Sequence, residues 1–233
     1  MKNIPVLLSI GALMMSSTPG SAFAMPVNVF GAGGGEYNVP TKSIVEKRFT
    51  GVSKQKYDYS CGSAALATLL KEFYGHDAYE GDVLKSMYEV GDQEAIKKKG
   101  FSLLDMRSYL ASIGYTADGY RAPLDKLVKA KIPAIALISP KGYSHFVVIA
   151  GVNADSVLIL DSSKGKHVLS RDDFEKQWNG ILFIVHDDMK VARQSFNSKD
   201  KWASHLQARF NVNLNDRDLA SIGLTTAYMP GYY

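Results

Sequence analysis

Helix-type patterns occupy the first half of this chain and strand-type runs follow in the second half, an order that strongly restricts its fold. Apolar residues recur at helical spacing after Cys61 and again after Ser102, which forms the signature of a capping box with Asp105. Short β-branched runs, bounded by turn-forming residues, come later at 135–138, 146–152, 157–160 and 181–185. This order predicts an α+β domain with N-terminal helices packed on a mostly antiparallel sheet.

The helix boundaries are marked by capping and stop residues. We expect the first helix to begin at Cys61, with Ser60 as its N-cap and Gly75 as its stop. Shorter helices are predicted over 79–88, in a basic segment ending at Gly100, between Ser102 and Gly114, and over 124–130.

Residues 1–24 have the composition of a secretory signal peptide. Lys2 precedes an apolar run over residues 4–15, and small residues lead to Ala22-Phe23-Ala24. The apolar run is shorter than the roughly 20 residues of a typical membrane-spanning helix. We therefore predict cleavage after Ala24 and a periplasmic or secreted product, with an uncleaved membrane anchor as the alternative.

The rest of the chain divides into three parts by composition. Residues 25–48 contain Gly33-Gly34-Gly35 and are expected to form a flexible Gly-rich lead-in, followed by a single domain over 49–188. Residues 189–233 are expected to form a C-terminal helical extension that packs on the domain or on a partner. No later run is long and apolar enough to predict a membrane span after signal removal.

The charges of the chain are balanced and mixed. The sequence has 27 Lys and Arg, 23 Asp and Glu, and a formal net charge of +4. The run Lys97-Lys98-Lys99 is most simply the solvated end of a helix, and nothing in this pattern predicts a nucleic-acid partner.

Cys61 is the single cysteine of a chain predicted to be exported. Exported proteins usually pair their cysteines in disulfides, so a lone thiol is either an inert core residue or one kept for its reactivity. A thiolate is the reactive form, and the start of a helix stabilises negative charge. The position of Cys61 at a predicted helix start favours a nucleophile.

His145 and Asp161 are the predicted partners of this nucleophile. His145 directly precedes the strand 146–152, and the residues between Gly151 and Ser156 predict a hairpin turn. A turn centred near Asn153 would set His145 opposite Asp161, with their Cβ atoms about 4.5–5.5 Å apart. We therefore expect His145 as the base and Asp161 as the group that orients it.

Cleavage of an acyl group also needs donors for the developing oxyanion. Gln55 lies shortly before Cys61, and its amide can reach the backbone N–H of Cys61. A glutamine before a helix is unremarkable by itself.

These residues together resemble the C39 peptidase family of papain-like cysteine peptidases, known as domains that cut leader peptides after a Gly-Gly pair. The resemblance rests on Gln55 followed by Cys61-Gly62, on the run 144–149, and on Leu160-Asp161, and it covers about residues 55–185. It implies a papain-like fold with Cys61 as nucleophile, His145 as base, Asp161 as its orienter and Gln55 as the oxyanion-hole residue.

Two positions depart from the family pattern. Ser60 replaces the acidic residue often found before the cysteine, and Ser162 replaces the proline that often follows the aspartate. Neither position is expected to carry chemistry. The chain also lacks the transporter segments that often follow such a domain, and stand-alone exported members are similar to components of functional-amyloid secretion systems.

The resulting hypothesis is an exported cysteine peptidase, with neither cofactor nor metal, that processes a secreted or cell-envelope polypeptide. A polypeptide with a Gly-Gly site is the candidate substrate, and amyloid-export machinery is a candidate partner. Two alternatives remain open: a binding or chaperone module with little turnover, and a papain-like acyl transferase in which an amine replaces water.

Overall fold

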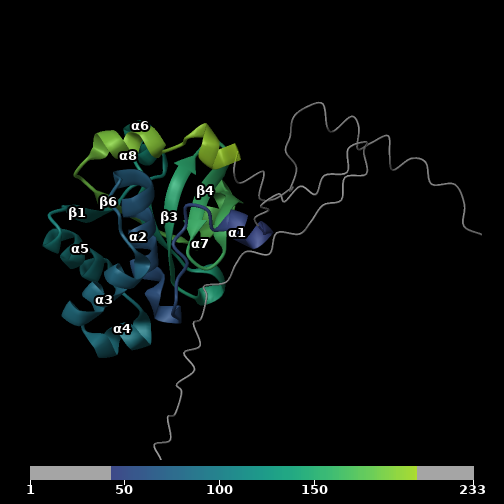
Figure 1. Cartoon of the computed structure of the whole chain (residues 1–233). Coiled ribbons are helices and arrows are strands. Elements are labelled where there is room, and N and C mark those ends of the chain that lie inside the picture. The colour runs from purple at the N-terminus through teal and green to yellow at the C-terminus, as the bar shows by residue number, and fades with distance from the viewer. Residues whose placement is uncertain (1–42, 204–233) are drawn as a thin grey trace, which may run out of the picture. The chain divides into compact units, whose positions relative to one another are not determined.

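A computed structural model describes residues 43–203, which contain one sheet of six antiparallel strands (Figure 1). The strand order across the sheet is β1-β6-β2-β3-β4-β5. The strands are β1 Ala117–Arg121, β2 Ala134–Ile138, β3 His145–Val152, β4 Ser156–Asp161, β5 Gly165–Ser170 and β6 Trp178–Val185.

Helices cover both faces of this sheet. They are α1 Ile44–Arg48, α2 Cys61–Tyr74, α3 Glu80–Val90, α4 Gln93–Lys99, α5 Leu103–Ser112, α6 Asp125–Ala130, α7 Arg171–Gln177 and α8 Met189–Ser195, with short 3-10 turns η1 Asp58–Ser60 and η2 Pro140–Gly142. Side chains of α2, α3, α4 and α5 form one core with one face of the sheet, whereas α6 and α7 contribute to a second core on the other face. The predicted α+β class and antiparallel sheet are confirmed.

Helix α2 is the central element of the first core and lies directly against β3 (Figure 1). Its boundaries agree with the prediction, because it begins at Cys61 and ends at Gly75, which has a φ of 65° in the left-handed region. The capping box of Ser102 and Asp105 at the start of α5 is also confirmed. Local capping chemistry therefore determines where the helices near the site begin and end.

The sequence pattern missed the two edge strands. β1 has only one buried residue, Ala117, and β5 is buried only at its first two residues, Gly165 and Lys166. Edge strands are commonly short and polar because they are covered on fewer sides. Such strands lack the apolar runs by which the central strands were identified.

Helix α1 corrects the expected extent of the flexible lead-in. Ser43 and Glu46 form a capping box that starts this helix, and α1 packs against β5. The Ser-x-x-Glu spacing is a helix-start signature, so the end of the 25–48 segment is ordered by its own capping residues. The remainder of that segment, the predicted signal peptide of residues 1–24 and the tail from residue 204 lie outside the described residues.

The register of the β3–β4 hairpin differs from the prediction by two residues near the site. Asp161 lies opposite Val147 rather than opposite His145. The turn is centred further along the chain than Asn153, because the Asn153 side chain accepts hydrogen bonds from the N–H groups of Asp155 and Ser156. A shift of two residues keeps His145 and Asp161 on the same face, whereas a shift of one would have separated them.

A β-bulge in this hairpin is held by Asn197, from the segment after α8. The register shifts between Ile149 and Gly151. Asn197 accepts a hydrogen bond from the N–H of Val152 at 2.8 Å, donates to its carbonyl at 2.9 Å, and donates its own backbone N–H to the Ala150 carbonyl at 3.0 Å. These bonds satisfy backbone groups that the bulge removes from the ladder.

We expect Asn197→Ala to lower the free energy of unfolding by about 1–3 kcal/mol, because it leaves both backbone groups of Val152 without their partner. Urea denaturation followed by circular dichroism measures this change. Gln194→Ala, at an exposed position on α8, is the control and should change stability by less than about 0.5 kcal/mol. Equal stabilities for the two variants would contradict this role of Asn197.

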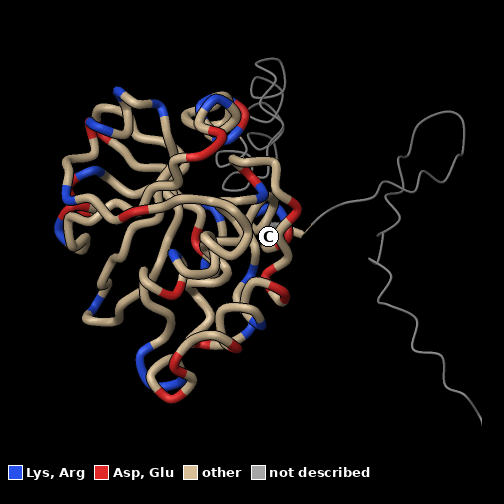
Figure 2. The backbone as a smooth tube through the Cα atoms, turned by 90° about the vertical axis from the view of Figure 1, so that its left-hand side faces the viewer, with Lys and Arg blue, Asp and Glu red and all other residues tan. Residues whose placement is uncertain are grey.

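Basic and acidic residues are interspersed along the described backbone (Figure 2). Lys97, Lys98 and Lys99 lie exposed in the last turn of α4, as expected for the solvated end of a helix. Within residues 43–203, no helix has the length and apolar character needed to cross a bilayer.

Candidate active site

The thiol of Cys61 lies at the first residue of α2, and Cys61 is 6% exposed. Ser60 occupies the N-cap position, as predicted, but its side chain does not cap the helix. It closes the preceding turn instead, accepting a hydrogen bond from the N–H of Tyr57 and donating to the Tyr57 carbonyl. The N-cap side chain therefore does not compete for the N–H groups of α2 beside the sulfur.

Gly62 is required here by packing. A Cβ atom at this position would lie 2.9 Å from side-chain atoms of both Phe101 and Met106. The glycine therefore lets the start of α2 approach the segment that leads into α5, and this contact fixes the position of Cys61.

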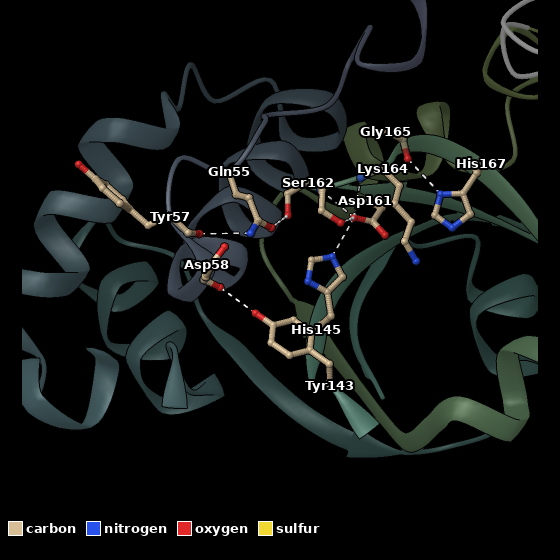
Figure 3. Close-up of polar contacts among 11 residues, drawn as sticks. Gln55, Tyr57, Asp58, Tyr143, His145, Asp161, Ser162, Lys164, Gly165 and His167 are labelled. Carbon is tan, nitrogen blue, oxygen red and sulfur yellow. Dashed lines mark hydrogen bonds and ion pairs between the residues drawn. The ribbon is translucent and has the colours of Figure 1, made fainter. Parts of the chain in front are cut away.

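His145 begins β3 and is 5% exposed. Its Nε2 atom lies 2.8 Å from Oδ1 of Asp161 (Figure 3). Attraction to Cys61 contributes to the raised pKa of His145, which places the ring within electrostatic reach of the sulfur. Since Asp161 engages Nε2, the remaining ring nitrogen, Nδ1, is the one available to Cys61. The structure thus brings the three predicted residues together.

Asp161 is fully buried at the end of β4, and four donors converge on its Oδ1 atom. Besides His145, these are the N–H of Ser163 at 2.8 Å, the Ser163 hydroxyl at 2.7 Å and the N–H of Lys164 at 3.1 Å. Oδ2 is buried without a hydrogen-bond partner among residues 43–203. The turn after β4 therefore fixes the carboxylate, and no sequence pattern predicts this contribution of Ser163.

The electrostatics favour a charged His145–Asp161 pair. Burial is the largest effect on His145 and opposes its charge, but the hydrogen bond to Asp161 and attraction to Asp161 and Cys61 outweigh it and raise its pKa to about 9. Burial likewise opposes the charge of Asp161, yet hydrogen bonds from His145 and Ser163 and attraction to His145 hold its pKa well below the usual range. The arrangement can therefore stabilise an imidazolium ion beside the sulfur.

Gln55 lies on the segment that precedes η1, and its amide is held at both ends (Figure 3). Its Oε1 atom accepts a hydrogen bond from the Ser162 hydroxyl at 2.8 Å, and its Nε2 atom donates to the Tyr57 carbonyl at 3.2 Å. The Gln55 backbone N–H also donates to the Ser162 carbonyl. Two hydrogen bonds therefore join Ser162 to Gln55.

An open pocket of about 330 Å³ lies beside these groups. Its lining residues are Gln55, Asp58, Pro140, Tyr143, His145, Ser163 and Lys164. The Tyr143 hydroxyl donates to the Asp58 carbonyl at 3.0 Å, so the phenol connects the segment before Cys61 with the segment before His145 (Figure 3). Burial and, next, the charge of Cys61 raise the pKa of Tyr143, which places this ring within electrostatic reach of the sulfur. Tyr143 was not predicted as a site residue, because its contact with Asp58 joins segments that lie far apart in the sequence.

The other described histidines have different partners. Nδ1 of His167 lies 3.1 Å from the Gly165 carbonyl, and Nε2 of His186 lies 3.1 Å from the Tyr120 hydroxyl. His76 packs its ring edge-on against Tyr115. Among residues 43–203, no group of three or more His, Cys, Asp or Glu side chains is arranged to hold a metal ion.

The model of the peptidase C39 family matches residues 50–190, which include all four predicted site residues. The chain belongs to the peptidase C39 family. Membership of this family identifies the chain as a cysteine peptidase. Two relatives that are described as proteases agree with this assignment.

This chain matches two relatives from Pseudomonas over most of their length. The "Probable functional amyloid protease FapD" of Pseudomonas fluorescens is 43% identical over 173 residues, 74% of this chain and 76% of that protein. The protein of the same description from Pseudomonas aeruginosa is 38% identical over 180 residues, 77% of this chain and 78% of that protein.

Solved C39 structures are similar over a smaller part of the chain. The peptidase domain of Streptococcus ComA has 19% identity and a TM-score of 0.49, and covers 57% of this chain and 96% of its own. A double glycine motif protease from an AMS/PCAT transporter, in complex with a leader peptide, has 25% identity and a TM-score of 0.47, and covers 57% of this chain and 89% of its own.

Proposed function

We propose that this C39 peptidase acts through Cys61 as nucleophile, His145 as general acid and base, Asp161 as the group that orients His145, and Gln55 as an oxyanion donor. The observation that carries the proposal is the buried 2.8 Å contact between Asp161 and His145, with Cys61 buried at the start of α2 within electrostatic reach of the His145 ring. A nucleophile beside a base that a third group orients is the arrangement expected for covalent acyl transfer.

In the first half of the reaction, the Cys61 thiolate attacks the carbonyl carbon of the scissile peptide bond. The carbonyl oxygen becomes an oxyanion and accepts hydrogen bonds from the Gln55 amide and the Cys61 N–H. The imidazolium of His145 then gives its proton to the leaving amine as the C–N bond breaks. The products are a free amine and a thioester on Cys61.

In the second half, neutral His145 removes a proton from a water molecule that attacks the thioester carbonyl. The same donors hold the second oxyanion, and its collapse releases the carboxylic acid and regenerates the thiolate beside the imidazolium. Asp161 stays ionised throughout, because its low pKa keeps it charged while it fixes the ring.

For the substrate, we propose a secreted or cell-envelope polypeptide cut after a Gly-Gly pair. The names of the two Pseudomonas relatives support a role with a functional-amyloid protein, and the neighbour solved with its leader peptide supports a double-glycine site. The signal-like composition of residues 1–24 supports action in the periplasm or outside the cell. Transfer to an amine is the second candidate reaction, since the acyl-enzyme step is the same.

Alkylation of Cys61 tests the proposed chemistry without knowledge of the substrate. Iodoacetamide should modify wild-type Cys61 rapidly at neutral pH, and His145→Ala should slow this reaction at least about tenfold because the thiolate loses its imidazolium partner. His186→Ala is the matched control and should react like the wild type. An equal rate in wild type and His145→Ala would contradict the proposed pair.

The pKa of His145 predicts an alkaline limit for activity. A folded-state pKa of about 9, above the ordinary 6.5, means that the charged pair stabilises the protein fully below pH 6.5. This contribution is lost as the pH rises through about 9. We therefore expect kcat/KM to fall above pH 9 together with part of the free energy of unfolding. A limit near pH 6.5 would contradict the charged pair.

A further inference from the structure

We infer that Ser162 is a positioning residue for the oxyanion site, an inference that rests on the proposed function of Gln55. The family resemblance leads one to expect proline at this position, and a proline has no hydroxyl group to donate. In this chain the hydroxyl donates to Oε1 of Gln55 at 2.8 Å. Ser162 is 2% exposed, so water does not compete freely for this hydrogen bond.

The hydrogen bond determines which way the Gln55 amide faces. An amide can present either its oxygen or its nitrogen to a substrate, and only the nitrogen can donate to an oxyanion. Because Ser162 binds the oxygen, the amide nitrogen is turned away from Ser162. One of its N–H groups donates to the Tyr57 carbonyl, and the other is left for a substrate oxygen.

The backbone supports the same orientation. The N–H of Gln55 donates to the Ser162 carbonyl at 3.1 Å, so the two residues are joined twice. Ser162 also directly follows Asp161, whose carboxylate holds His145. Two consecutive residues thus position two parts of the site. Ser162 contacts Gln55, and Ser163 fixes the Asp161 carboxylate that contacts His145 (Figure 3).

The test compares two reactions of Cys61 that differ in their need for an oxyanion site. Hydrolysis of p-nitrophenyl acetate passes through a tetrahedral oxyanion, whereas alkylation by iodoacetamide does not. Ser162→Ala should lower kcat for the ester about tenfold, with little change in KM, because the donor is still present but no longer fixed. The alkylation rate of Cys61 should stay within twofold of the wild type.

A double-mutant cycle with Gln55→Ala identifies the residue through which Ser162 acts. Gln55→Ala alone should lower kcat about 10²-fold or more, and adding Ser162→Ala should cause almost no further loss. Ser162→Thr, which keeps the hydroxyl, should recover most of the activity. Ser112→Ala, which removes an exposed hydroxyl at the end of α5, is the matched control.

Each contrary result overturns a distinct statement. If ester hydrolysis by the wild type does not depend on Cys61, the proposed function fails. If it depends on Cys61 but Ser162→Ala keeps full kcat, or loses the same factor with and without Gln55, the inference about Ser162 fails alone. If alkylation falls as much as hydrolysis, Ser162 acts on the thiolate or on the fold, and the inference also fails.

Discussion

Cys61→Ala should lower peptide cleavage about 10⁶-fold, the loss expected when the nucleophile of a catalytic unit is removed. The substitution removes one small buried atom, so the free energy of unfolding should change by only about 1 kcal/mol. Mass spectrometry of secreted peptides can measure the effect in cells: termini that end in Gly-Gly should be present with the wild type and absent with the variant. Purified protein provides the stability value.

This result also separates the enzyme from the binding-module hypothesis. A binding module would support its partner equally well without the thiol, so identical secreted termini and identical export in wild type and Cys61→Ala would contradict catalysis. Cys61→Ser is the matched variant, since its hydroxyl occupies almost the same space but is a far weaker nucleophile. It should be nearly as inactive as Cys61→Ala.

Asp161→Ala should have the second largest effect, because it changes both activity and stability. It leaves buried His145 and the N–H groups of Ser163 and Lys164 without their acceptor. Removing one partner of a buried pair costs about 3–5 kcal/mol, and loss of the orienting group lowers kcat by about 10⁴. Denaturant unfolding and steady-state kinetics measure the two effects.

Asp161→Asn separates geometry from charge. The side-chain oxygen of asparagine can still accept the hydrogen bond from His145, but it carries no charge. Activity should therefore fall less than in Asp161→Ala, and the alkaline limit should move below pH 9 because His145 loses an attractive partner. An Asn variant with an unchanged alkaline limit would contradict the role of the Asp161 charge.

The sequence allowed the location of Cys61 to be predicted because the relevant signals are local. A helix start, a left-handed stop at Gly75 and a capping box at Ser102 act over a few residues each, and the structure contains all three. Apolar runs located the central strands, and the order of helices before strands predicted their antiparallel arrangement. The capping box of Ser43 and Glu46, which starts α1 in the segment predicted to be flexible, is a local signal of the same kind.

The pairing of His145 and Asp161 was predicted by an incorrect register. The turn chemistry of Asn153 and the bulge at Gly151 determine the true register, and the bulge depends on Asn197 from a distant segment. The prediction of the pair survived because the error was an even number of residues. An odd error would have placed the two side chains on opposite faces.

The contacts of Ser162 and Tyr143 could not be predicted from the sequence. Ser162 meets Gln55 across 107 positions, and Tyr143 meets Asp58 across 85. Neither pair belongs to one helix or one hairpin, so no periodicity relates them. Both depend on how the segment before α2 lies over the ends of β3 and β4.

The hydrogen bonds between Asn197 and the β3–β4 hairpin determine how far this protein can be shortened. The family match ends at residue 190, but the side chain that completes the β3–β4 bulge comes seven positions later. A chain shortened at the family boundary would expose the Gly151 surface that Asn197 and Trp202 cover. The minimal unit for expression, for grafting the peptidase onto another protein or for exchanging domains with a transporter therefore extends at least through residue 203.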